Sequence, residues 1–265
     1  MEQNSGLSVR LLIMVGIIGF SFFKYYFTTS VNPVTGEKQH VSLTPDQEIA
    51  MGVQSAPEMA AQMGGEFNDA KTVNAIKSIG NKLVNSTQAK QSPYVFKFHV
   101  LADPETVNAF ALPGGQIFIT VGLLKHLTSE DQIAGVLGHE MGHVINRHSA
   151  QQMEKQQEMS GIVNGVVMGA TGGGGMASAQ IAQYAAQMLN LKYSRNDELE
   201  ADKFGLHYMN ESGYKPTEML TVMKVLADVS GGGNKSDFQS THPSPANRMI
   251  KIKEELAKMG VASPN

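Results

Sequence analysis

"VLGHEMGHVINRH", residues 136–148, places two histidines four positions apart, with a glutamate directly after the first. Apolar residues recur at helical spacing from Thr128 onward and no proline interrupts them, so the stretch is predicted to lie in a helix. Residues four apart project from one face of a helix, which lets His139 and His143 bind a single ion. The pattern is typical of zinc sites in which a third side chain completes the protein ligands and the glutamate, here Glu140, acts as general base on a water molecule.

The alternative interpretation of this motif is an ordinary helix with a chance pair of histidines. The apolar surroundings, "IAGVLGHEMGHVI", favour a buried metal site, but the site needs a third ligand. His148 is a poor candidate, because on a continuous helix a residue five positions beyond His143 points about 140° away from it.

A better third ligand lies in "NDELEAD", residues 196–202. On a helix Glu198 and Asp202 share one face, whereas Glu200 turns to the far side. Glu198 is therefore predicted to bind zinc, and Asp202 to accept the free N–H of a zinc-bound histidine. The alternative is an exposed acidic helix start, which the helix dipole would favour.

Other segments of the chain show helix and strand patterns around this site. Alternating residues after Tyr94 and again around "GGQIFITVG" predict two or three short antiparallel strands. Helices are predicted over 44–63, 73–84, 177–191, 197–212, 216–229 and 245–259, and four consecutive glycines predict a loop within 169–178. A flexible segment over 160–180 beside the site suggests a lid.

Four motifs in order, "NAFALPGGQIFITVGLL" (108–124), "HEMGH", "ELEADKFG" and "THPSPANR", give the chain a wider resemblance. Over roughly residues 42–255 it resembles the superfamily of gluzincin zinc metallopeptidases that includes HtpX, BepA and the Ste-type CAAX proteases. The resemblance implies an α+β fold: a mainly helical zincin-type protease domain with a small antiparallel sheet beside the HExxH helix.

Carried over to this chain, the resemblance implies one zinc ion bound by His139, His143 and Glu198, with Glu140 as general base and Asp202 supporting a ligand. It also implies that His242 and Arg248 lie near the metal and assist at the oxyanion or regulate access. From the residues alone, His242 would be read as part of a capping loop and Arg248 as part of a solvated helix face.

A substrate site is predicted from the strand region before the zinc helix. An exposed strand edge there would let a peptide pair as an extra strand. Asn108, Ala109 and Phe110 are the residues predicted to bind this substrate, a peptide or unfolded protein.

The N-terminal residues predict contact with a membrane. Leu7 to Phe27 is about as long as a bilayer-spanning helix, with Arg10 and Lys24 able to reach the interface. The predicted organisation is a membrane anchor or signal segment over 1–30, a linker over 31–43 and a metallopeptidase domain over 44–260. The expected location is the inner membrane with the domain facing the periplasm or outside, or the periplasm after signal cleavage.

Composition excludes several classes of protein. The chain has 265 residues, a net charge of −3 and no cysteine, which rules out disulfides and thiolate metal sites. No cluster of lysine and arginine could follow a phosphate backbone, so nucleic acid is not an expected partner. The sequence does not specify an oligomeric state.

The predicted function is a zinc-dependent endopeptidase that acts on misfolded or envelope proteins. One alternative is a membrane-tethered chaperone or binding module that keeps a structural zinc site. Another is a protease for prenylated or membrane-embedded proteins. The sequence after "THPSPANR" contains no tetratricopeptide array, and the chain has no additional apolar spans, so neither a docking repeat nor an intramembrane chamber is expected.

Overall fold

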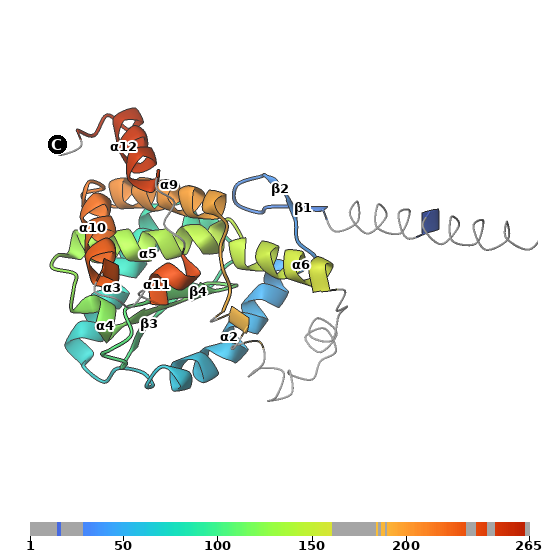
Figure 1. Cartoon of the computed structure of the whole chain (residues 1–265), viewed down its shortest axis with the longest axis horizontal. Coiled ribbons are helices and arrows are strands. Elements are labelled where there is room, and N and C mark those ends of the chain that lie inside the picture. The colour runs from blue at the N-terminus through green and yellow to red at the C-terminus, as the bar shows by residue number, and fades with distance from the viewer. Residues whose placement is uncertain are drawn as a thin grey trace, which may run out of the picture.

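The computed structural model places three short strands at the centre of a mainly helical domain (Figure 1). The predicted α+β class is therefore confirmed. The residues that the structure describes are 15–16, 29–160, 184, 187–188, 190–231, 237–242 and 247–262.

Two predicted features fall mainly outside this range. The predicted anchor over 7–27 lies outside the described residues except for Val15 and Gly16, as does most of the predicted lid over 160–180 and of the helix over 177–191. Within the described ranges, we find no helix with both the length and the apolar character that crossing a bilayer requires.

The first two long helices begin at caps that the sequence encodes. Helix α2, Pro45–Gln62, starts with a capping box in which the Thr44 side chain accepts from the Gln47 backbone N–H and the Gln47 side chain accepts from Thr44 N–H. Helix α3, Ala70–Ser86, is capped by Asp69 and is followed by the short 3-10 helix η1, Gln88–Gln91.

The central sheet has the order β3-β5-β4, with β3 at Lys97–Leu101, β4 at Ala109–Leu112 and β5 at Gln116–Thr120. Strands β4 and β5 form an antiparallel hairpin, but β3 and β5 are parallel. The prediction that all these strands run antiparallel was wrong on this pair. The chain reverses direction between β3 and β4 and again between β4 and β5, so β5 runs in the same direction as β3. Because β5 lies between the other two strands, it pairs with β3 in parallel.

Both faces of the sheet are covered. Phe98, Val100, Ile117 and Ile119 pack into a core with α3 and the zinc-motif helix, whereas alternate residues such as Phe110 and Phe118 pack into a second core with α2. Successive side chains of a strand point to opposite faces, which explains this division. Burial on both faces holds the sheet rigidly beneath the helix that carries the HExxH motif.

That helix, α5, runs over Glu130–Ile145 and follows the short helix α4, Val121–Leu124. It ends before His148, because Arg147 adopts a left-handed backbone with φ 60°. A new helix, α6, begins at His148 and runs to Ser160. The assumption of one continuous helix through His148 was therefore wrong.

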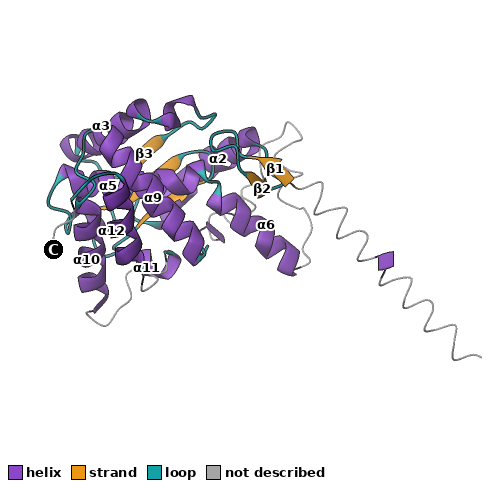
Figure 2. Ribbon diagram, turned by 90° about the horizontal axis from the view of Figure 1, so that it is seen from above, coloured by secondary structure: helices purple, strands orange, loops and turns teal. Residues whose placement is uncertain are grey.

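Helix α9, Arg195–Glu211, lies against α5 (Figures 1 and 2). The two helices approach closely where glycines face each other: a Cβ on Gly138 would lie 3.3 Å from Gly205 Cα, and one on Gly142 would lie 2.9 Å from the Ala201 carbonyl oxygen. Helices α10, Glu218–Gly231, α11, Asp237–Thr241, and α12, Arg248–Lys258, complete the described C-terminal part.

A small hairpin closes the C-terminal end of α5. It consists of β1, Thr29–Val31, and β2, Lys38–His40. The Asn32 side chain donates to the Ile145 carbonyl at 2.8 Å, and the Gln39 side chain donates to the Asn146 carbonyl at 2.9 Å. These bonds satisfy carbonyls that a helix end leaves without partners. Residues 29–43, most of which the sequence suggested as a linker, are therefore folded onto the domain.

Candidate metal centre

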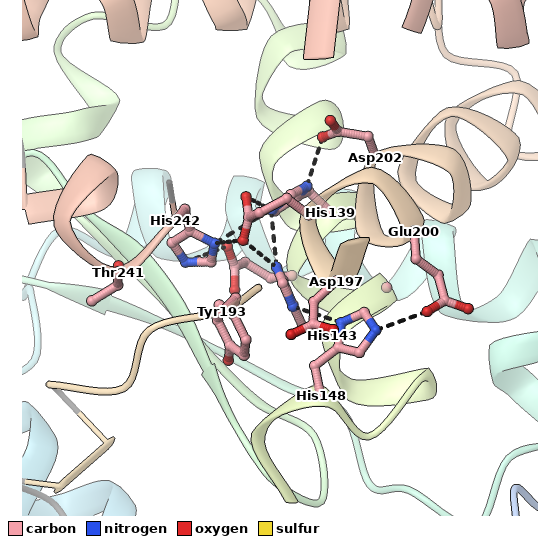
Figure 3. Close-up of polar contacts among 12 residues, drawn as sticks. His139, His143, His148, Tyr193, Asp197, Glu200, Asp202, Thr241 and His242 are labelled. Carbon is pink, nitrogen blue, oxygen red and sulfur yellow. Dashed lines mark hydrogen bonds and ion pairs between the residues drawn. The ribbon is translucent and has the colours of Figure 1, made fainter. Parts of the chain in front are cut away.

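Four buried side chains converge in the interior: His139 and His143 from α5, Glu198 from α9, and His242 directly after α11 (Figure 3). Each offers one ligand atom, and these atoms all lie within 4.8 Å of one another. His139 Nε2 lies 3.1 Å from His143 Nε2 and 3.5 Å from His242 Nδ1. Glu198 Oε1 lies 3.1 Å from His242 Nδ1 and 3.5 Å from His143 Nε2.

The donor set and its spacing fit zinc. Zinc binds imidazole nitrogen and carboxylate oxygen at about 2.0–2.2 Å with tetrahedral geometry, which places neighbouring ligand atoms about 3.3 Å apart. The four separations above, from 3.1 to 3.5 Å, agree with that spacing. The site residues are therefore positioned to hold one zinc ion.

The outer nitrogen of His139 is held by an acid that is itself held by an arginine. His139 Nδ1 lies 3.0 Å from Asp202 Oδ1. Arg248 donates through Nε to Asp202 Oδ2 at 2.7 Å, and through a second nitrogen to Glu198 Oε2 at 2.9 Å. With Nδ1–H donated to Asp202, the Nε2 lone pair of His139 faces the other ligand atoms.

His143 is held from its face and from its edge. The Tyr193 ring stacks on it with centroids 3.9 Å apart, and the Tyr193 hydroxyl bonds to Ser149 Oγ at 2.8 Å. The outer nitrogen of His143, Nδ1, lies 2.9 Å from Nδ1 of His148. The ring therefore has a fixed orientation with Nε2 toward the cluster.

Glu140 lies beside the cluster without a hydrogen bond. Among the described residues, neither of its carboxylate oxygens has a partner, although the side chain is fully buried. Its Oε1 lies 3.7 Å from His242 Nε2, which is likewise without a partner. Burial raises the pKa of Glu140 above its ordinary value. A raised pKa suits a carboxylate that takes up and returns a proton.

Two of the four side chains, His143 and Glu198, have pKa shifts that favour the protonation states a metal requires. Burial lowers the pKa of His143 well below its ordinary value, which keeps the imidazole neutral. Burial would raise the pKa of Glu198, but the nearby His242 and the close contacts of His143 and His242 with the carboxylate hold this pKa well below the ordinary range. A neutral imidazole and an ionised carboxylate are the forms that bind zinc.

A small pocket adjoins the cluster at the edge strand β4. Asn108 and Phe110 line it together with Tyr193 and His242. Ala109 is not among the residues that line it; its side chain is buried in the core. Two of the three residues predicted to bind substrate thus lie beside the metal centre.

The structure brings together the predicted ligands His139, His143 and Glu198 and places Asp202 against His139. Arg248 is buried rather than on a solvated helix face. His242 lies within ligand distance and is not part of a surface loop.

Two further residues, His148 and Tyr193, contact His143 and were not predicted as site residues. For His148 the available signal was "NRH" after the zinc motif, since asparagine is common where helices end. Tyr193 lies in a segment without a motif, and the sequence gives no signal for its role.

Comparison with known proteins agrees with this geometry. Residues 70–256 match the model of a protein family described as peptidase family M48. The chain belongs to peptidase family M48. Its cluster of three histidines and one glutamate offers donor atoms that suit zinc, as membership of a metallopeptidase family leads one to expect.

Individual M48 relatives cover most of this chain. A beta-barrel assembly-enhancing protease of Yersinia pestis is 30% identical over 234 residues, which are 86% of this chain and 47% of that protein. The mitochondrial metalloendopeptidase OMA1 of Schizosaccharomyces pombe is 30% identical over 242 residues, 89% of this chain and 69% of that protein. The metalloprotease LoiP of Escherichia coli is 26% identical over 227 residues, which are 84% of this chain and 86% of that protein. The chain spans about half the length of its beta-barrel assembly-enhancing relatives.

Proposed function

We propose that this chain is a zinc-dependent endopeptidase that cleaves misfolded or envelope proteins, with Glu140 as general base. The carrying observation is that Glu140 is fully buried next to the ligand cluster while neither of its oxygens has a hydrogen-bond partner among the described residues. A buried carboxylate without partners costs folding free energy, so its presence needs a functional reason.

Zinc, when bound, polarises a carbonyl oxygen and lowers the pKa of water. The protein residues supply proton transfer and positioning. Glu140 takes a proton from the attacking water and returns it to the leaving amine, without a covalent intermediate. Arg248 and Asp202 keep Glu198 and His139 in place through the hydrogen bonds described above.

A peptide substrate has a place to bind along the sheet. Strands β3 and β4 are the two edge strands of the described three-stranded sheet, whereas β5 is the central strand and has partners on both sides. The prediction of an exposed strand edge at "GGQIFITVG" was therefore wrong, because this stretch forms β5; in this proposal the edge is that of β4, which lies beside the pocket. Pairing of the substrate backbone with β4 would place its side chains toward the pocket lined by Asn108 and Phe110 and would make cleavage tolerant of sequence.

His242 regulates access in this proposal. In the structure it supplies the fourth ligand atom of the cluster, so a substrate carbonyl needs the position that its imidazole occupies. Its outer nitrogen faces Glu140 at 3.7 Å, which places the imidazole between the base and the other ligands. His242 must turn away when substrate enters.

The rival function, a chaperone with a structural zinc site, draws support from the same four-ligand arrangement, because structural sites are closed. A structural zinc site does not explain why the Glu140 carboxylate is buried beside the ligands without hydrogen bonds. The substitution Glu140→Gln separates the two functions: it preserves shape and is expected to retain zinc while casein cleavage falls by about 10²–10⁴-fold. The exposed variant Glu211→Gln is the control. Cleavage by Glu140→Gln at the rate of this control would rule out the proposed role of Glu140.

We also propose that residues 7–27 anchor the chain in the inner membrane with the domain facing the periplasm or outside, or are cleaved to release it there. The name of the Yersinia relative, which refers to β-barrel assembly, supports an envelope location. Because the chain has no cysteine, Lys38→Cys on the exposed hairpin provides a single thiol. Labelling of this thiol in intact spheroplasts by a membrane-impermeant maleimide is expected. Labelling only after lysis would contradict the orientation.

A further inference from the structure

We propose that His148 and Glu200 form a relay that holds the zinc ligand His143 in the tautomer and orientation needed for metal binding. Neither residue belongs to the ligand cluster. His148 Nδ1 lies 2.9 Å from His143 Nδ1, and His148 Nε2 lies 3.0 Å from Glu200 Oε2 (Figure 3). The inference concerns zinc binding and does not depend on which protein is the substrate.

The order of protons in the relay follows from its two ends. His143 uses the Nε2 lone pair toward the cluster, so its Nδ1 carries the hydrogen and donates it. His148 Nδ1 must then be the acceptor, which leaves the hydrogen of a neutral His148 on Nε2. That hydrogen is donated to the carboxylate of Glu200. An ionised carboxylate has no hydrogen to donate and can only accept. Glu200 thus selects the tautomer of His148, and His148 selects that of His143.

The break between α5 and α6 creates this contact. On a continuous helix His148 would point away from His143, but the left-handed backbone of Arg147, φ 60°, redirects the chain so that α6 begins at His148. The next residue, Ser149, bonds to the tyrosine that stacks on His143. The two residues directly after the break therefore hold one ligand, from its edge and from its face.

The relay reaches the protein surface at only one end. The His148 side chain is 1% exposed, whereas that of Glu200 is 34% exposed. Glu200 can consequently be changed without opening the core. A second histidine–glutamate pair, His207 Nε2 and Glu255 Oε1 at 2.9 Å, lies outside the site and provides a matched control.

The experiment measures zinc dissociation constants by chelator competition on the full chain. His148→Leu removes the acceptor and is expected to weaken zinc binding by about 10–100-fold. His148→Asn should restore most of the affinity, because its Oδ1 can take the position of the histidine Nδ1. His207→Leu should bind zinc as tightly as the unmodified chain. Equal affinity of His148→Leu and His207→Leu would overturn the proposal.

Glu200 provides a second test if His148→Leu does not fold. Glu200→Ala is expected to weaken zinc binding, whereas Glu200→Gln, whose amide oxygen still accepts from His148, should preserve it. Equal zinc affinity of these two variants would overturn the relay. Loss of casein cleavage in Glu200→Ala with unchanged zinc affinity would count against the relay while leaving the proposed protease function intact.

A direct measurement on the unmodified, zinc-loaded chain reports the tautomer. Long-range ¹H–¹⁵N NMR spectra of histidine-labelled protein should show His148 protonated on Nε2 and unprotonated on Nδ1. A hydrogen on His148 Nδ1 would contradict the proton order derived above.

Discussion

Three of the four residues of the metal centre are each held by a different neighbour. His139 is bonded to Asp202, His143 to His148, and Glu198 to Arg248. The spacing in the sequence was enough to predict His139, His143 and Glu198, because all three depend on helix periodicity. His242 followed only from the resemblance to a family, and His148 was rejected on helix geometry. Neither can be derived from local pattern, because one depends on tertiary packing and the other on a backbone break.

Substitution of His242 tests its proposed control of access. We expect His242→Ala, loaded with zinc, to bind a small hydroxamate at least about tenfold more tightly than the unmodified chain. In the unmodified chain the form in which His242 occupies the fourth position dominates, and only the fraction of molecules in the open form can bind the hydroxamate, which lowers the apparent affinity by that fraction. Isothermal titration calorimetry at saturating zinc measures this. His207→Ala is the control, and identical affinities in all three proteins would argue against a closed form.

Arg147 combines an unfavourable backbone with a buried ion pair. Its Nε donates to Glu48 Oε1 at 3.0 Å, and both side chains are almost completely buried. Burial raises the pKa of Glu48 to about 6, although the Arg147 charge opposes this. Loss of Arg147 leaves this acid buried without its counter-charge, which costs about 3–5 kcal/mol.

Two substitutions at this position separate the backbone from the charge. Arg147→Ala and Arg147→Gly both lose the ion pair, but glycine tolerates a positive φ. We therefore expect the free energy of unfolding of Arg147→Gly to exceed that of Arg147→Ala by about 1 kcal/mol. Urea unfolding of the zinc-loaded proteins provides the comparison. A lower stability for the glycine variant would show that the backbone at this position is not strained.

At the level of elements, the distance between α5 and α9 determines whether Glu198 reaches the histidines. Glycines at the contact allow this approach, and one of them, Gly142, lies within the zinc motif itself. The sequence predicted both helices but not their close packing. Nothing in the sequence distinguishes a helix glycine that allows close packing from one that occurs by chance.

Alanine substitutions along α5 test the requirement for close packing. A Cβ at position 142 would lie 2.9 Å from the Ala201 carbonyl oxygen, so Gly142→Ala should lower stability by about 1–3 kcal/mol and weaken zinc binding as α9 moves away. At position 135 the nearest atom is the flexible Met209 sulfur at 3.5 Å. Gly135→Ala is therefore expected to raise stability by about 0.5–1 kcal/mol with unchanged zinc affinity. Denaturant unfolding and chelator competition measure both effects, and equal behaviour of the two variants would refute the packing argument.

The sheet shows a limit of prediction at the same scale. Alternation identified β3 and β5 but not β4, whose four residues are all buried. The β4–β5 hairpin turns at "LPGG", where Gly114 and Gly115 have φ of 82° and 109°. Alternation carries no information on strand order. The central position of β5, and hence its parallel pairing with β3, depends on how the hairpin packs against α5.

Across the whole molecule, the metal centre joins parts of the chain that are far apart in sequence. It connects α5, α9 and the residue after α11, positions 139 to 242. Zinc binding to the folded state only should therefore stabilise the entire domain.

Removal of the metal tests this connection. At free zinc about 1,000 times its dissociation constant, binding contributes about 4 kcal/mol. For a domain of this size a chelator should then lower Tm by about 10 °C. Differential scanning calorimetry with and without chelator measures the shift, and His139→Ala should show little of it. An unchanged Tm in the unmodified chain would mean that zinc does not hold these elements together.

The hairpin on the end of α5 has a spatial consequence for catalysis. Strand β1 begins at Thr29, and the Asn32 and Gln39 side chains bond to the end of the helix that carries His139 and His143. A bilayer segment ending near residue 27 would leave only a couple of residues, roughly 7 Å of extended chain, before this docked hairpin. The metal centre would then lie at a fixed height close to the lipid headgroups, and only polypeptides that come near that surface could be cut.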